Sequence, residues 1–283
     1  MNIIKLREEL KRFLLEDIGE QDLTSTSIFP STQIGEGKIL AKEEGILAGV
    51  IVIKECLHLF DSSIEVTLHK SDGDRITPGD TIATVKGPIV YLLTGERIIL
   101  NLLQRMSGIA TLTSKAVRAL NSDHTKICDT RKTTPGLRMF EKYAVSCGGG
   151  SNHRFGLYDG VVIKDNHIAF SGSITNAVMA VRENVGHMVK LEVETESKEA
   201  VLEAVDAGAD VIMFDNRTPT EVEEFVCLVP KHVITEASGG ITIEQLHEYG
   251  KTGVDYISLG MLTHSYKALD ISFVTGWKDV RGK

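Results

Sequence analysis

Several features that mark common classes of protein are scarce in this chain of 283 residues. Its four cysteines lie far apart, with no CxxC pair, so neither a disulfide framework nor a zinc site is expected. Basic residues are not in excess: the formal net charge is -8, which argues against a general nucleic-acid binder. The longest apolar run, 45–53, is too short to span a membrane, and the N-terminus lacks the apolar core of a secretory signal. These absences predict a globular cytoplasmic protein with reduced thiols.

What is present fits two domains of different character. Hydrophobic residues make up 42% and charged residues 25%, as in globular proteins with a substantial core. Residues 31–93 are rich in short strand patterns separated by Gly and Asp turns, with helices expected at 1–20 and around 50–60. The segment 73–83 also resembles biotinyl and lipoyl carrier modules, but Lys86 is a poor candidate for their modified lysine. We therefore expect an N-terminal α/β sandwich.

A long helix is predicted over 94–120. It carries an apolar stripe at helical spacing, formed by Ile98, Ile99, Leu102, Leu103 and Met106. Thr94 is the expected N-cap, which puts Arg97 in the first turn, where the helix dipole disfavours a cation. Gly108 indicates either a break or a close contact of the helix backbone.

After residue 120 the pattern changes to alternating strands and helices. Strand-like runs occur at 125–132, 159–167, 188–195, 210–216, 232–240 and 255–261. Nearly continuous apolar strands separated by helices predict a parallel sheet covered on both faces. Six units are fewer than a full barrel has, so an incomplete β/α barrel and a doubly wound sheet both fit.

Each of these strands carries polar or small residues toward its end. In chain order they are Asp129, Thr130, Arg131 and Lys132; Lys164, Asp165, Asn166 and His167; Glu192 and Glu194; Asp215 and Asn216; Glu236, Ser238, Gly239 and Gly240; and Ser258 and Gly260. Active sites of barrels and open α/β sheets form at the carboxyl ends of parallel strands. Six successive strands with such residues therefore predict one shared site.

Cations gather at the start of this region. Between the first two strands six Lys or Arg stand against two acids, and His153 lies among them. Arg138 and Lys142, four residues apart, fit a solvated helix face, and Cys147 beside three glycines is either a reactive thiol or a small buried apolar residue. The late Gly-rich turns, each followed by a helix pattern, favour phosphate binding. Glu194 and Asp215 suit sugar hydroxyls or Mg²⁺, or are ordinary strand-end acids paired with lysines.

The motifs that hold these residues are long and specific. "DTRKTTPGLR", "CGGGSNHRFGLYDGVVIKDNH", "EVETES", "FDNRT", "EASGGI" and "TGVDYISLGMLTHS" closely resemble the quinolinate phosphoribosyltransferase family. The resemblance extends to "LLEDIGEQDLTS" and "LLTGERIILNLLQRMSGIAT", so it covers nearly the whole chain. Gln21, where the family usually has glycine, is the departure we note. The resemblance implies an N-terminal α/β sandwich domain over 1–106 and an incomplete barrel over 107–283, whose C-terminal tail can return to the first domain.

The resemblance also implies an activity and a set of site residues. The family joins quinolinate to phosphoribosyl pyrophosphate and gives nicotinate mononucleotide, pyrophosphate and CO₂ for NAD synthesis, with Mg²⁺ and usually as a homodimer. The residues carried over to quinolinate binding are Arg131, His153, Arg154 and, from the neighbouring subunit, Arg97. Lys132 and Lys164 would lie between the substrates. Glu194 and Asp215 would bind ribose hydroxyls and Mg²⁺. The 5-phosphate would be held by Ser238, Gly239, Gly240 and Gly260.

Three alternatives remain at this stage. A relative encoded with molybdenum genes would act on another ring, but "VVIKDNH" fits the quinolinate enzymes better. A Schiff-base aldolase or decarboxylase would place lysines where Lys132 and Lys164 stand, yet a lysine among acids has little reason to lose its proton. A binding protein without catalysis fits poorly with clustered charges of both signs.

Overall fold

The computed structural model describes residues 1–275, which form two compact units. Unit 1 contains Met1–Leu112, Pro135–Gly149 and the described residues from Ser265 to Thr275, and unit 2 contains Thr113–Thr134 and Gly150–His264. In this division unit 1 extends past the boundary expected at residue 106 and also takes in 135–149, together with the C-terminal segment for which a return to the first domain was expected. None of the described helices is long and apolar enough to cross a membrane. All four cysteines are free.

Unit 1 is built on an antiparallel sheet. Its strands are β1 (Ile34–Ala41), β3 (Glu65–Leu68), β5 (Thr81–Pro88) and β12 (Ile271–Thr275), in the order β12-β1-β5-β3. A second, two-stranded sheet pairs β2 (Gly45–Ile46) with β4 (Arg75–Ile76). Lys86 lies within β5, opposite Glu36 and Glu65. Because the lysine of a carrier module must stand at a hairpin tip, this position rules out the carrier interpretation.

The first three helices of the chain belong to unit 1. They are α1 (Ile3–Ile18), α2 (Leu23–Ile28) and α3 (Ile51–Leu57), and α1 packs on α3. Leu6, Leu10 and Leu14 recur every four residues and form the buried stripe of α1. Its first turn is capped by the Asn2 side chain, which accepts hydrogen bonds from two backbone N–H groups.

The long helix α4 spans Ile89–Leu120 and begins five residues earlier than predicted. Thr94 is therefore not the N-cap: it lies inside the helix and its hydroxyl donates to the Val90 carbonyl at 2.8 Å. The expectation for Arg97 was also wrong, because this exposed residue lies in the third turn rather than the first. Gly108 does not break the helix. A Cβ there would lie 2.2 Å from the Lys267 carbonyl oxygen, which confirms a close backbone contact.

Helix α5 (Arg138–Cys147) also differs from the solvated face that was expected. Lys142 is fully buried, as is Glu141, which accepts a hydrogen bond from Arg105 Nε at 2.9 Å. Burial raises the pKa of the Cys147 thiol to about 11, so the thiol is protonated at neutral pH and is not a reactive thiolate.

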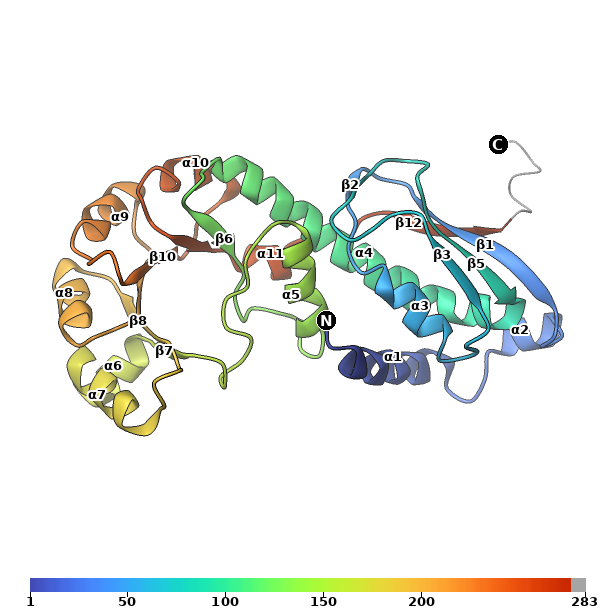
Figure 1. The fold of residues 1–283 in the computed structure, drawn as a ribbon, viewed down its shortest axis with the longest axis horizontal. Coiled ribbons are helices and arrows are strands. Elements are labelled where there is room, and N and C mark those ends of the chain that lie inside the picture. Colours follow the sequence, from blue (N-terminus) through green and yellow to red (C-terminus); the bar gives the residue numbers. More distant parts are fainter. Residues whose placement is uncertain (276–283) are drawn as a thin grey trace. The chain divides into compact units, whose positions relative to one another are not determined.

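Unit 2 contains a six-stranded parallel sheet. Its strands are β6 (Lys126–Cys128), β7 (Val161–Ile163), β8 (Leu191–Thr195), β9 (Val211–Asp215), β10 (Ile234–Ser238) and β11 (Tyr256–Ser258). The order is β6-β11-β10-β9-β8-β7, so β6 and β7 are its edges and the barrel is incomplete, as predicted. The helices are α6 (Asp165–Ser171), α7 (Ile174–Asn184), α8 (Lys198–Asp206), α9 (Pro219–Val226), α10 (Leu246–Tyr249) and α11 (Met261–His264). Figure 1 shows α8 and α9 along the outer side of the curved sheet.

The segment after α5 runs along the free edge of β6. Ser151 forms a parallel bridge with Cys128, and its N–H donates to the Ile127 carbonyl at 2.8 Å. The chain at 151–154 thereby follows β6 for a short distance without becoming a strand. This arrangement brings His153 and Arg154 to the interior of the sheet.

Candidate active site

A cavity of about 540 Å³ lies at the carboxyl ends of the strands of unit 2. Five strands, the residues that follow β6 and the segment at 151–154 contribute to it, as expected for a parallel α/β sheet. It brings together every predicted site residue except Arg97 and Gly260. The lining residues are Thr130, Arg131, Lys132, His153, Arg154, Val162, Lys164, Glu194, Met213, Asp215, Asn216, Glu236, Ser238, Gly239, Gly240 and Ser258. We call it the substrate cavity.

Gly260 and Arg97, the two predicted residues that do not line the cavity, lie in different places. Gly260 follows β11 and lies directly behind a lining residue: a Cβ at Gly260 would be 2.8 Å from Lys132 Cδ. Glycine is needed there so that the aliphatic part of Lys132 can pass. Arg97 is exposed on α4, in unit 1, and is not among the residues that line the substrate cavity.

Two guanidinium groups lie on one side of the substrate cavity. Arg154 Nη1 donates to the Gly160 carbonyl oxygen at 2.8 Å, which fixes the direction of its side chain. Burial and the positive charge of Arg131 lower the pKa of Arg154. Arg131 Nε is buried and has no hydrogen-bond partner among the described residues. Neighbouring cations with an unsatisfied donor favour binding of an anion, and planar guanidinium groups suit carboxylates in particular.

Two carboxylates at strand ends also line the substrate cavity, and we call Glu194 and Asp215 the rim pair. Lys164 Nζ donates to Glu194 at 2.5 Å, and Asn216 Nδ2 donates to Asp215 at 2.6 Å. Burial and the negative charge of Glu194 raise the pKa of Asp215. Two hard oxygen ligands that repel each other fit a divalent cation such as Mg²⁺, which takes one or two carboxylates together with substrate phosphate. The ion pair also engages the Lys164 nitrogen, which argues against a Schiff-base role.

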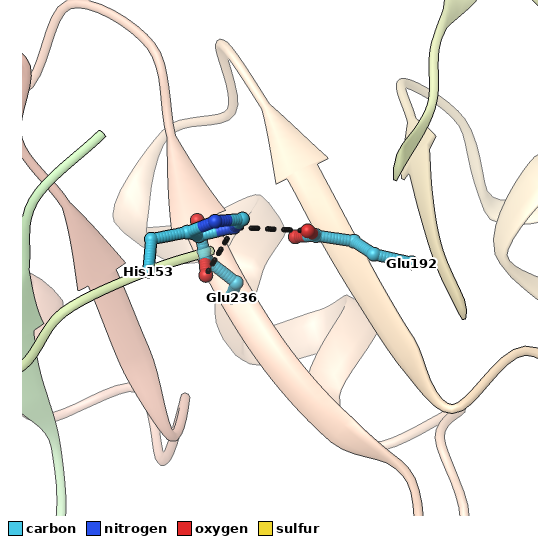
Figure 2. Close-up of side chains that lie close together, drawn as sticks. All are labelled: His153, Glu192 and Glu236. Atoms are coloured by element: carbon cyan, nitrogen blue, oxygen red, sulfur yellow. Dashed lines mark hydrogen bonds and ion pairs between the residues drawn. The ribbon is translucent and has the colours of Figure 1, made fainter. Parts of the chain in front are cut away.

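A second pair of carboxylates lies deeper in the sheet around His153. We call Glu192 and Glu236 the inner pair; both are 4% exposed. Figure 2 shows the imidazole between them, with Nε2 at 2.9 Å from Glu192 Oε2 and 3.7 Å from Glu236 Oε2. Because Nδ1 accepts the Arg154 backbone N–H at 2.7 Å, a neutral His153 carries its proton on Nε2. Their ligand atoms lie within 4.8 Å of one another, as a metal would require, but a protonated Nε2 has no lone pair to offer.

The inner pair has an unusual environment for acids. Burial, followed by the charge of Glu192, raises the pKa of Glu236 to about 7. Asp129, which is also buried, holds the segment that carries His153: its carboxylate accepts the His153 backbone N–H at 2.9 Å and the Asn152 amide at 2.7 Å. The sequence placed these three acids near strand ends without a role. Their position within apolar strands was the available signal, because an acid is rarely fully buried without a partner.

The glycine turn after β10 is shaped by its neighbour after β9. Gly239 has φ +91°, and a Cβ there would lie 2.3 Å from Asn216 Oδ1. Asn216 itself has φ 53°, so two left-handed residues pack against each other beside Asp215. The helices that follow are shorter than expected: α10 and α11 have four residues each. A phosphate at this turn would therefore rely on backbone N–H groups and on the hydroxyls of Ser238 and Ser258, which are 2.9 Å apart, and less on a helix dipole.

Comparisons with known proteins agree with this geometry. The family models for the N-terminal and C-terminal domains of quinolinate phosphoribosyl transferase match residues 22–107 and 109–274. The chain is 58% identical over 272 residues to a probable carboxylating nicotinate-nucleotide pyrophosphorylase of Bacillus subtilis, covering 96% of this chain and 94% of that protein. It is 41% identical to the solved structure of NadC from Streptococcus pyogenes, with a TM-score of 0.93 and 97% of each chain covered. The nicotinate-nucleotide pyrophosphorylase of Francisella tularensis gives 35% and 0.90, with 96% of each chain covered. The chain belongs to the quinolinate phosphoribosyltransferase family.

Proposed function

We propose that this protein transfers the phosphoribosyl group of phosphoribosyl pyrophosphate to quinolinate, with loss of CO₂. The products are nicotinate mononucleotide and pyrophosphate, and the role is de novo NAD synthesis. The observation that carries the proposal is the substrate cavity of a family member, in which cations face acids across a space of about 540 Å³. A dicarboxylate and a phosphorylated sugar need these opposite charges in one place.

The cationic side suits quinolinate. Arg131 and Arg154 present guanidinium groups to the cavity, and an anion there would offset their mutual repulsion. Quinolinate supplies two adjacent carboxylates, one for each arginine. His153 lines the same side, although its ring nitrogens already bond within the protein, so its contact with substrate would come through the face or edge of the ring.

The acidic side suits the phosphoribosyl donor. Glu194 and Asp215 would hold ribose hydroxyls and Mg²⁺, which would neutralise phosphate charge in the departing pyrophosphate. Lys132 and Lys164 line the space between the two sides. The 5-phosphate would lie at the turn formed by Ser238, Gly239 and Gly240, with Gly260 behind Lys132.

The residues of this chain then have distinct roles in the transfer. The ring nitrogen attacks the anomeric carbon as the bond to pyrophosphate breaks, and the sugar develops positive charge. The rim pair stabilises that charge, and the two lysines stabilise the negative charge that leaves. Both interactions are strongest when the charges are fully developed, which is the condition for lowering the barrier rather than merely binding substrate.

Two further parts of the proposal concern assembly and location. We propose a homodimer in which Arg97 of one chain reaches the substrate cavity of its partner. Its support is that Arg97 is exposed and matches the family motif. A cytoplasmic location is supported by the four free cysteines.

The direct test is incubation of the purified protein with quinolinate, phosphoribosyl pyrophosphate and Mg²⁺, with products identified by mass. Nicotinate mononucleotide and pyrophosphate are expected in equal amounts. Nicotinate offered in place of quinolinate should react far more slowly, because it lacks the second carboxylate. Lys132→Gln should abolish most activity, whereas Lys126→Gln, at the other end of β6, is the matched control and should retain it. Absence of product, or equal use of nicotinate, would refute the proposal.

A further inference from the structure

Unit 2 contains a second cavity of about 330 Å³ at the amino ends of the strands. Residues at or just before the start of five strands line it: Val161, Lys190, Val211, Ile234 and Tyr256. Four residues line both this cavity and the substrate cavity, namely His153, Arg154, Val162 and Glu236. Glu192 lines only the second cavity. Glu236 therefore stands at the partition between two spaces, whereas Glu192 lies behind it.

The reaction also requires a proton donor, a role that the rim pair and Lys164 do not fill. Once the ring nitrogen carries the sugar, the bond from the adjacent ring carbon to its carboxylate breaks and CO₂ leaves. The electron pair of that bond stays on the ring carbon, which must gain a proton. An acid that faces the substrate cavity has to supply it. Lys164 is paired with Glu194, and the rim pair serves the donor sugar.

We propose that Glu236 is this acid: it donates its proton to the ring carbon as the bond to CO₂ breaks, and water in the second cavity returns the proton. The inference rests on the proposed function. In balance, the carboxylic acid of Glu236 loses its proton to the ring carbon and becomes a carboxylate. A proton from solvent restores it, so each turnover consumes one proton and releases one CO₂.

The contacts of Glu236 support the assignment. Its Oε1 is buried without a hydrogen-bond partner among the described residues, as is Oε1 of Glu192. The nearby donors of Glu236 are the His153 imidazole, the Ser258 hydroxyl and the Cys128 thiol, and none of them is a lysine or arginine that would hold both buried acids in the ionised form. Burial and the nearby charge of Glu192 raise the pKa of Glu236 to about 7, so the neutral acid is available near neutral pH. The second cavity is large enough for several water molecules and has polar walls at Asp159 and Lys190.

Glu236→Gln tests the proposal because it keeps the shape of the side chain and removes the acidic proton. In a single turnover, pyrophosphate release should stay within about threefold of wild type, whereas CO₂ release should fall about 100-fold or more, the usual range for loss of a general acid. Quinolinate mononucleotide should then accumulate and be detectable by mass. Parallel changes in both products, or no change in either, would overturn the proposal.

Glu192→Gln is the matched control, since it alters the same cluster behind the partition. In Glu192→Gln, pyrophosphate and CO₂ should be released at equal rates, whether or not that common rate changes. If CO₂ release slowed alone in Glu192→Gln and not in Glu236→Gln, Glu192 rather than Glu236 would be the proton donor. If Glu236→Gln does not fold, Glu236→Asp can be measured in its place. Its side chain is still an acid but is shorter, so its carboxyl group lies farther from the ring carbon and CO₂ release alone should slow about tenfold. A wild-type protein that makes no nicotinate mononucleotide would refute the proposed function, whereas an active wild type with an unaffected Glu236→Gln would refute only this inference.

Val211→Phe tests the route by which the proton returns. Val211 lines the second cavity and does not line the substrate cavity, so a larger side chain there should restrict access of water without touching substrate. The first turnover should proceed at the wild-type rate, and later turnovers should be slower. Equal slowing of the first and later turnovers would contradict the route.

Discussion

The rim pair and the inner pair are chemically the same groups, held on strands β8, β9 and β10 at two depths of one sheet. Glu194 and Glu192 stand two residues apart on β8, so their side chains point to the same face. At the rim, Glu194 meets a lysine at 2.5 Å, and Asp215 meets an amide. At the inner level, Glu192 and Glu236 share one histidine and are almost fully buried. Depth and partner, rather than residue type, separate the two pairs.

The comparison shows which charges the carboxylates can stabilise at each depth of the sheet. The rim pair faces lysines and the open end of the cavity, and its remaining repulsion suits a metal ion and a sugar that becomes positive. The inner pair has no lysine or arginine among its hydrogen-bonded neighbours in the described part of the chain. One of its acids is therefore the natural place for a transferable proton, as in other active sites where two acids are pushed to different protonation states.

The largest expected effect comes from removing charge at the rim. Asp215→Asn and Glu194→Gln keep shape, and each should lower kcat/KM about 10²- to 10³-fold, the usual loss when one electrostatic stabiliser is removed. Equilibrium titration should show weaker Mg²⁺-dependent binding of phosphoribosyl pyrophosphate and nearly unchanged binding of quinolinate. Glu203→Gln, outside the substrate cavity on α8, is the control. A loss confined to quinolinate would contradict the role of the rim pair.

The next effect concerns Arg154, which lines both cavities. Arg154→Ala should weaken quinolinate binding by about 1.5–3 kcal/mol, because a charge-assisted hydrogen bond in a buried site is lost. Calorimetric titration with quinolinate would measure it, and Arg182→Ala, whose guanidinium pairs with Asp210 at the surface, is a matched control. Unchanged affinity for quinolinate in Arg154→Ala would show that the carboxylates bind elsewhere.

A smaller signal, the activity recovered in mixed dimers, would show whether the quinolinate-binding residues are complete within one chain. Arg97→Ala and Lys164→Ala homodimers should each be nearly inactive if Arg97 serves the partner's cavity. When the two are unfolded together and reassembled in equal amounts, about half of the dimers are mixed, and each has one site with the full residue set. Activity should therefore recover to about a quarter of wild type. No recovery, with mixed dimers verified by mass, would remove Arg97 from the partner's site.

The smallest effect is on stability and belongs to the inner pair. The pKa of Glu236 is raised in the folded protein, so folding favours its protonated form. This contribution is complete below the pKa of the unfolded chain, near 4.5, and is lost as pH rises through about 7. The difference in unfolding free energy between wild type and Glu236→Gln should then shrink by at most about 1.4 kcal/mol per pH unit in that window. A difference that stays constant with pH in chemical denaturation would contradict a titrating Glu236.

The sequence predicted the parts of this comparison that depend on periodicity. Each strand of unit 2 lies within an expected run, and the rim residues follow from the rule that sites form at strand ends. The start of α4 was missed because the apolar residues before Thr94 were assigned to the preceding strand, although Gly87 and Pro88 stand directly before the helix. Burial of Lys142 was missed because it depends on packing between segments distant in sequence.

The contacts of the inner pair could not be predicted from the sequence for a similar reason. Glu192, Glu236 and His153 come from three separate segments, and only the fold brings the two carboxylates within ion-pairing distance of the imidazole. A strand pattern shows that an acid faces inward, but it does not show which side chain it meets. Partners of buried charges decide their protonation, so the chemistry of this level required the structure.

Infrared spectroscopy tests the contrast between the two pairs most directly, because a protonated carboxylic acid has a carbonyl band that a carboxylate lacks. At a pH somewhat below 7, the wild-type protein should show a buried carboxylic acid band that shifts in D₂O and fades as pH is raised. Glu236→Gln should lack this band, while Glu194→Gln should retain it. Absence of the band in wild type, or its loss in Glu194→Gln and persistence in Glu236→Gln, would contradict the assignment of the proton to the inner pair.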